Sequence, residues 1–329
     1  MIILDILLNG TKDPEHLVRA EAARLLGDIG DRKAVPYLIA MLKKDNWYCK
    51  VTAIYALEKL GDKRAIPVLR DMAKDPLVFD FNGMYNHDMI RIAAVAALLK
   101  LGDKQPTERI SEILTIKNAQ GFLELSAYIL DLPDTEATRP LKEIVSFDFV
   151  ENYSKNFQSG IHMRVLDALP YFKTSKSLGM IKKYLKHFSR YVRAKAASAL
   201  LKYKDTSSNR AILKKLFKKE KTVFTRIKLA VLLRLGNTAV IIRRALKSGC
   251  YFTRATALDA VAELKMYKLA GAVLPLLKDE HFYVRICAIE ALEKLNYNQA
   301  GSKIEKLLKD ENPRVRLQAA KYFVMKEMQ

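Results

Sequence analysis

Basic side chains recur in pairs at matched positions of three successive segments of this chain. Each segment reads apolar, apolar, basic, basic, any residue, apolar, basic, and the three begin at Met180, Ile212 and Ile241. The basic positions are Lys182, Lys183, Lys186, Lys214, Lys215, Lys218, Arg243, Arg244 and Lys247. Cationic side chains hold phosphate and carboxylate groups by charge and by hydrogen bonds. The spacing therefore predicts an anion-binding surface, with a nucleic acid or an acidic protein as the partner.

The net charge of the chain is concentrated in the same region. The 329 residues carry a formal charge of +21. Residues 151–250 contain 24 basic and 4 acidic side chains, whereas residues 1–150 contain 20 and 22. A solvated face normally mixes both signs, and unrelieved like charges repel one another unless a partner neutralises them. We interpret the basic central repeats, 161–250, as the binding region, although a set of solvated helix faces is an open alternative.

The sequence lacks the patterns that would supply catalytic or metal chemistry. The five histidines fall in different parts of the chain, and no Gly-rich phosphate loop or Gly-x-Ser-x-Gly motif occurs. Cys49 and Cys287 follow the pattern of small buried residues. Three cysteines are typical of a reducing compartment, and no apolar run is long enough to span a membrane. We expect a cytoplasmic monomer without a transmembrane segment, a metal, a cofactor or catalytic residues.

A basic residue marks one slot of a repeating unit of about thirty residues. The slot holds Arg19, Lys50, Arg91, Arg164, Arg193, Arg226, Arg254, Arg285 and Arg316. One such residue at the same position of each unit is typical of a structural contact that recurs from repeat to repeat, here called the anchor ladder. We therefore expect these anchor residues to bond loop carbonyls or an acidic residue of a neighbouring repeat, and not a ligand.

Each unit predicts two helices. Apolar residues fall at helical spacing from Val18 onward, and Asp13 or Asn312 has the side chain of an N-cap. Gly30 then ends the first helix, because glycine adopts the left-handed C-terminal conformation without strain. A helix pair this short cannot bury both faces alone, whereas stacked pairs form a continuous core. The fold prediction is all-α, one solenoid over residues 1–329.

The repeat follows a consensus that is clearest over residues 13–73 and returns over 188–204 and 281–316. It reads Asp-Pro-x-x-x-Val-Arg-x-x-Ala-Ala, followed by Leu-Gly, Gly-Asp and a later Pro-x-Leu. This unit resembles the short HEAT-like repeats first associated with phycobilisome (PBS) lyases. The resemblance implies a right-handed superhelix of about ten helical hairpins whose second helices line the concave face. It places the basic rows in a concave groove. We expect residues 2–8 and the last helix to cap opposite ends.

Two aromatic insertions, residues 77–88 and 147–160, interrupt the repeat. Both contain Phe-Asp-Phe with a tyrosine four residues after the second phenylalanine. Inserted segments of repeat proteins often lie on a binding edge. The insertions are interpreted as partner-binding loops, or alternatively as aromatic covers for exposed solenoid edges. The candidate loop residues are Phe79, Phe81, Tyr85, Phe147, Phe149 and Tyr153.

These observations favour a non-enzymatic binding scaffold with a basic concave patch. The first alternative is a protein–protein adaptor that docks partners on the aromatic edge. A further alternative, suggested by the resemblance, is an enzyme such as a DNA glycosylase or a bilin lyase subunit. A glycosylase needs a carboxylate beside the DNA, and residues 151–250 offer only Glu151, Asp167, Asp205 and Glu220.

Overall fold

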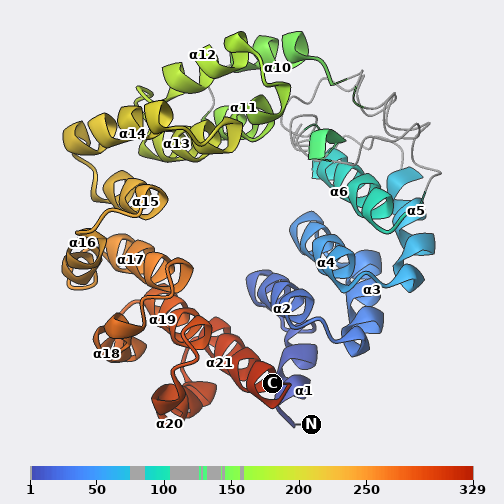
Figure 1. Cartoon of the computed structure of the whole chain (residues 1–329). Coiled ribbons are helices and arrows are strands. Elements are labelled where there is room, and N and C mark those ends of the chain that lie inside the picture. The colour runs from blue at the N-terminus through green and yellow to red at the C-terminus, as the bar shows by residue number, and fades with distance from the viewer. Residues whose placement is uncertain are drawn as a thin grey trace. The chain divides into compact units, whose positions relative to one another are not determined.

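The computed structural model describes residues 2–74, 86–103, 126, 129–131, 142, 145–155 and 159–328 (Figure 1). The chain divides into two compact units. Unit 1 comprises Met1–Asn118 and Val273–Gln329, and unit 2 comprises Ala119–Ala272. The described residues form helices and no strand, and the helices pair into stacked hairpins. The prediction of an all-α solenoid is confirmed.

Unit 1 holds helices from both ends of the chain. They are α1 (Ile2–Gly10), α2 (His16–Ile29), α3 (Val35–Lys44), α4 (Trp47–Leu60), α5 (Ile66–Lys74), α6 (Asn86–Lys100), α19 (Phe282–Lys294), α20 (Gly301–Lys306) and α21 (Pro313–Glu327). Short 3₁₀ turns lie at Arg32–Ala34, Lys63–Ala65, Leu274–Lys278, Asn298–Ala300 and Leu307–Lys309.

Unit 2 holds the central repeats. Its helices are α10 (Phe147–Ser154), α11 (Ser159–Phe172), α12 (Ser175–Tyr184), α13 (Arg190–Tyr203), α14 (Ser207–Lys219), α15 (Val223–Leu233), α16 (Thr238–Ala245) and α17 (Tyr251–Glu263). A 3₁₀ turn at Tyr267–Leu269 leads into α18 (Ala270–Val273), where the unit ends.

Helix ends follow the sequence signals in most repeats. Gly30, Gly61 and Gly102 have φ values of 83°, 62° and 79° and end first helices as predicted. Asn312 caps α21 by accepting a hydrogen bond from the Arg314 amide. Asp13 does not cap a helix, because α2 begins at His16, and its carboxylate instead accepts from the Glu15 amide.

The core of unit 2 is a continuous apolar cluster that runs through the helix pairs. Leu166, Leu169, Val192, Leu200 and Leu213 each have 1% exposure or less. These residues come from α11, α13 and α14, so each hairpin completes the core of its neighbour. The stack fixes the orientation of every helix face in the unit.

First and second helices of unit 2 lie on different sides of the stack. α11 packs on α13, α13 on α15 and α15 on α17, whereas α12, α14 and α16 pack mainly on the first helices beside them. In a curved stack of hairpins, the more closely packed layer is the inner one. Figure 1 shows the same arrangement within unit 2, with α13, α15 and α17 inside α14 and α16. The expectation that second helices line the concave face is wrong: they lie on the outer side.

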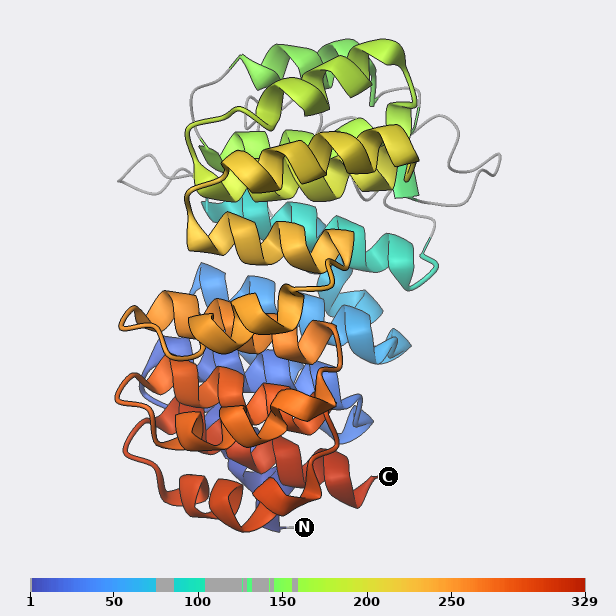
Figure 2. The same cartoon turned by 60° about the vertical axis from the view of Figure 1, so that its left-hand side comes forward.

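The two ends of the chain pack on one another inside unit 1. α21 contacts both α1 and α2, and the two termini lie close together (Figure 2). Gly10 approaches Leu317 so closely that an added Cβ would lie 2.8 Å from its Cδ2 atom. Arg314 and Arg24 add ion pairs to Glu21 and Glu290, at 3.8 and 3.5 Å. The terminal helices therefore cover each other and do not cap separate ends, because each presents an apolar face that fits the other.

Candidate anion-binding surface

The nine predicted basic side chains lie on or just after α12, α14 and α16. Eight of them are exposed, and Lys182 is partly buried. Lys186 and Lys247 follow the last residues of α12 and α16 by two positions. The structure thus places all nine on the outer layer of unit 2.

Apolar residues of the same pattern hold this surface in place. The residue before each basic pair is Ile181, Leu213 or Ile242, and all three are fully buried. Leu185 and Leu246, three residues after the first basic position, are also buried. One face of each short helix therefore enters the core, which turns the basic pair outward.

The basic surface has no internal neutralisation. None of the nine side chains forms an ion pair with a carboxylate in the described part of the chain. The nearby acids are already occupied: Glu220 pairs with Arg193, Asp167 with Lys195, and Asp205 with Arg210. Of the four carboxylates considered for glycosylase chemistry, three therefore neutralise neighbouring cations.

Arg19, Arg193 and Arg285 form the predicted structural ladder. Arg193 donates to the Phe188 and His187 carbonyls at 2.8 and 2.9 Å and binds both oxygens of Glu220 at 2.8 and 2.9 Å. Arg285 makes the corresponding contacts with the Asp279 and Glu280 carbonyls and with Asp310.

Titration of Glu220 is coupled to this ladder. Burial by itself would raise the pKa of Glu220, but hydrogen bonds from Arg193 and Thr222 outweigh it and lower the pKa to about 2. The carboxylate therefore remains charged, and the ladder intact, well below neutral pH.

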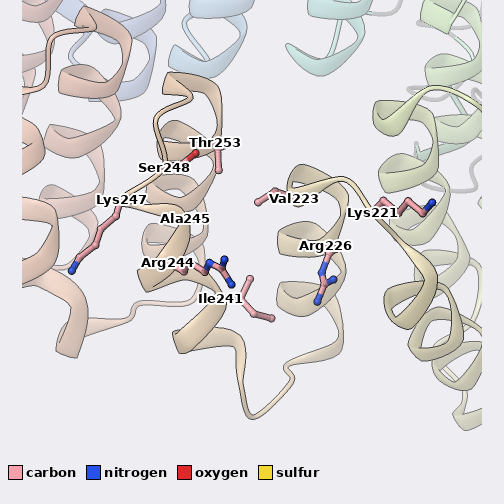
Figure 3. Close-up of a pocket in the computed structure, with 9 residues that line it drawn as sticks. All are labelled: Lys221, Val223, Arg226, Ile241, Arg244, Ala245, Lys247, Ser248 and Thr253. Atoms are coloured by element: carbon pink, nitrogen blue, oxygen red, sulfur yellow. The ribbon is translucent and has the colours of Figure 1, made fainter.

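A hollow of about 590 Å³ opens beside the last basic helix. Its lining comprises Lys221, Val223, Arg226, Ile241, Arg244, Ala245, Lys247, Ser248 and Thr253. In Figure 3, Arg244 extends from α16 towards α15, which carries Arg226, and Ser248 and Thr253 lie next to each other. The lining has four cations, two hydroxyl groups and no carboxylate. Such a set suits an anion that accepts hydrogen bonds.

The aromatic insertions differ from the predicted loops where the structure describes them. Phe147–Ser154 is helix α10, and Phe147 and Phe149 pack against the core of unit 2. The ring of Phe147 meets that of Phe172 edge to face, with centroids 5.5 Å apart. Tyr153 belongs to the same helix. The other predicted loop residues, Phe79, Phe81 and Tyr85, lie outside the described residues.

Sequence reasoning missed an aromatic cluster on the first helices of unit 2. Tyr191, Phe224 and Phe252 have ring centroids 5.1 to 5.9 Å apart. Arg190 lies over the rings of Tyr191 and Phe252. Each ring residue stands two positions before an anchor arginine. An aromatic residue at the same position of three successive repeats could therefore have predicted this cluster from the sequence.

The structure also joins two histidines that the sequence places in different repeats. His162 Nδ1 and His187 Nε2 are 3.1 Å apart. The backbone amide of Ser189 donates to His187 Nδ1, so the proton of neutral His187 lies on Nε2, and His162 accepts it. Burial, followed by the charges of His162 and Arg193, lowers the pKa of His187. The described residues contain no group of three or more His, Cys, Asp or Glu side chains that could hold a metal.

Comparison with known proteins identifies the repeat. A profile of HEAT repeats matches residues 4–80 and 238–323. A search of curated proteins gave no match. Within the described ranges, no helix combines the length and the apolar character needed to cross a membrane.

Solved structures with weak similarity span nearly the whole chain. One is an engineered protein, with 16% identity over 99% of both chains and a TM-score of 0.33. Human deoxyhypusine hydroxylase in complex with glycerol has 17% identity over 99% of this chain and 96% of its own, with a TM-score of 0.33. The CpcE–CpcF complex of phycocyanin lyase from Nostoc sp. has 16% identity over 99% and 94%, with a TM-score of 0.31.

Proposed function

We propose that this HEAT-repeat chain is a non-enzymatic binding scaffold, and that the outer layer of its central repeats binds a nucleic acid through the phosphate backbone. The observation that carries the proposal is the matched set of basic side chains on α12, α14 and α16, of which eight are exposed and none is paired with a described carboxylate. Repeated unpaired cations in successive repeats suit a partner whose own charge repeats along its length.

The chemistry of the surface supports binding without base recognition. Seven of the nine residues are lysines, which supply charge without the planar fork that reads a base edge or a carboxylate. Contacts to phosphates position a nucleic acid but carry no sequence information. The partner is therefore bound by charge density, whatever its sequence.

The pairing of three acids near this surface supports the non-enzymatic part of the proposal. Glu220, Asp167 and Asp205 are each held by a basic neighbour. A carboxylate in such a pair is stabilised as the anion and cannot act as a general acid near neutral pH.

The test is a titration of the purified chain with a fluorescent 20-base-pair DNA duplex and a single-stranded RNA of equal length, at 50 and 200 mM salt. If about five phosphates are engaged, the log–log slope of affinity against salt is near −4 to −5. The variant with Lys182, Lys183, Lys214, Lys215, Arg243 and Arg244 all replaced by Gln is expected to lose at least about a hundredfold in affinity. Its helical circular dichroism should be unchanged.

The matched control replaces six exposed basic residues of unit 1, Lys33, Lys43, Lys44, Lys63, Lys74 and Lys303, by Gln. This control removes the same charge, so loss of binding in both variants would show a general charge effect and would overturn the proposed site. No binding to either nucleic acid at 50 mM salt would overturn the proposed function, and binding of polyglutamate alone would assign the surface to an acidic protein.

A further inference from the structure

The anchor ladder lacks its acid at the repeat that forms the hollow beside α16. Arg19, Arg193 and Arg285 each bind a carboxylate that comes from the next repeat. The carboxylates bound by Arg193 and Arg285 are Glu220 and Asp310, and each stands six residues before the next anchor. The position six residues before Arg254, which should serve Arg226, is Ser248.

Ser248 occupies the same backbone position as these acids. The Ser248 carbonyl accepts from Arg254 at 2.9 Å, as the Asp310 carbonyl accepts from Arg316 at 2.8 Å. The Ser248 hydroxyl accepts from the amide two residues later, at Cys250, and the Asp310 carboxylate accepts from Asn312 in the same way. Ser248 therefore has the local geometry of the ladder acid without its charge.

Arg226 consequently differs from Arg19, Arg193 and Arg285. Its guanidinium lies over the ring of Phe217, with its central carbon 5.1 Å from the ring centroid. No hydrogen bond or ion pair joins that guanidinium to an acceptor within the described residues, whereas Arg193 makes both kinds of contact. The space that a carboxylate would fill is part of the hollow lined by Arg226, Arg244, Ser248 and Thr253.

We propose that this hollow is a phosphate-binding site in which a phosphate group of the bound nucleic acid takes the place of the missing ladder carboxylate. Arg226 and Arg244 supply guanidinium donors, and the hydroxyls of Ser248 and Thr253 supply neutral donors. Lys221 and Lys247 lie at the rim, where their side chains extend away from the gap (Figure 3). The volume of about 590 Å³ exceeds that of one phosphate, which leaves room for the chain on either side.

The inference rests on the proposed function for the source of the phosphate, but the site itself is tested alone. Inorganic phosphate is titrated into the protein and followed by the shift in melting temperature, with sodium chloride at equal ionic strength as the reference. Phosphate is expected to raise the melting temperature of the unmodified chain, since a ligand that binds only the folded state stabilises it.

The decisive variant is Ser248→Asp, which restores the ladder acid. It is expected to raise the melting temperature in the absence of phosphate and to abolish the further rise on phosphate addition, because the new carboxylate occupies Arg226. Lys43→Gln is the matched control: it changes the net charge equally, lies on the exposed surface of unit 1 and should retain the phosphate response. Arg226→Gln should also abolish the rise in melting temperature on phosphate addition, because it removes the guanidinium without adding an acid.

Two results would overturn the site. One is an unmodified chain that shows no phosphate-specific shift up to 20 mM, and the other is a Ser248→Asp variant that responds to phosphate like the unmodified chain. The duplex DNA titration then tests the source. An affinity for the duplex about tenfold lower for Ser248→Asp than for Lys43→Gln supports the nucleic acid as the source of the phosphate. Equal affinities overturn that assignment, while the response to inorganic phosphate still supports the site.

Discussion

The paired arginines of unit 1 and the outer basic side chains of unit 2 have opposite surroundings. In unit 1, Arg24 contacts Glu21, Asp28 and Glu290, and Arg70 holds both oxygens of Asp103. In unit 2, the cations of α12, α14 and α16 face outward without a described carboxylate.

Both regions are built from the same hairpin, so the fold does not require the unpaired cations. Isolated surface charges contribute little to stability, whereas several like charges together repel one another. A bound polyanion, as proposed above, would neutralise these charges and relieve their mutual repulsion.

The largest change in stability is expected when a contact of the anchor ladder is removed. Glu220→Gln removes the carboxylate that pairs with Arg193. It should lower the free energy of unfolding by about 3 kcal/mol, as removal of one partner of a buried pair does. Urea denaturation with circular dichroism measures the change. A loss below about 0.5 kcal/mol would mean that the ladder contributes nothing to stability.

Acid should act on the same pair. The pKa of Glu220 is lowered from its usual 4.5 to about 2, so the charged carboxylate stabilises the folded state above pH 4.5. That contribution is lost as the pH falls from 4.5 through 2. Melting temperatures measured from pH 6 to pH 2.5 should decline more steeply for the unmodified chain than for Glu220→Gln, and parallel curves would contradict this assignment.

Single charge removals should distinguish the two regions. Arg70→Gln breaks a bidentate pair with Asp103, whose side chain is only 4% exposed, and should cost about 1 kcal/mol. Lys214→Gln removes an unpaired exposed charge, so its effect should stay within about 0.5 kcal/mol and is expected to be neutral or slightly stabilising. Equal losses in the two variants would remove the contrast between the regions.

The smallest effect concerns the three thiols. Burial raises the pKa of Cys49 to about 12, and Cys287 is also buried. Cys250 is exposed, and a hydrogen bond from the Thr253 amide lowers its pKa. One thiol of three is expected to react with a chromogenic disulfide at pH 7 in the native protein, and all three in guanidinium chloride. Reaction of two native thiols would contradict the burial of Cys49 or Cys287.

Much of the fold followed from local patterns. Helical spacing, the glycines at positions 30 and 61 and the recurring anchor predicted stacked hairpins, and the ladder of Arg193 and Arg285 was expected before its contacts were known. These features depend on a few neighbouring residues of the chain. The side of the curve on which α12, α14 and α16 lie depends on how successive repeats pack, and the sequence-based expectation placed it wrongly.

The insertion at Phe147 shows the same limit. Its aromatic composition suits either a binding loop or a core contact, and only the proximity of Phe172 and the apolar cluster decides for the core. The pairing of α1 with α21 likewise joins segments that are far apart in the chain. No local pattern specifies such a contact, because the two helices lie at opposite ends of the sequence.

The sequence by itself determined the repeat, the ladder and the concentration of charge in residues 151–250, because each is a property of residue type and spacing. Tertiary structure decided which face carries that charge, which carboxylates remain available and where the chain ends meet. It also showed that Ser248 stands beside an unpaired Arg226, since that relation joins neighbouring repeats through space.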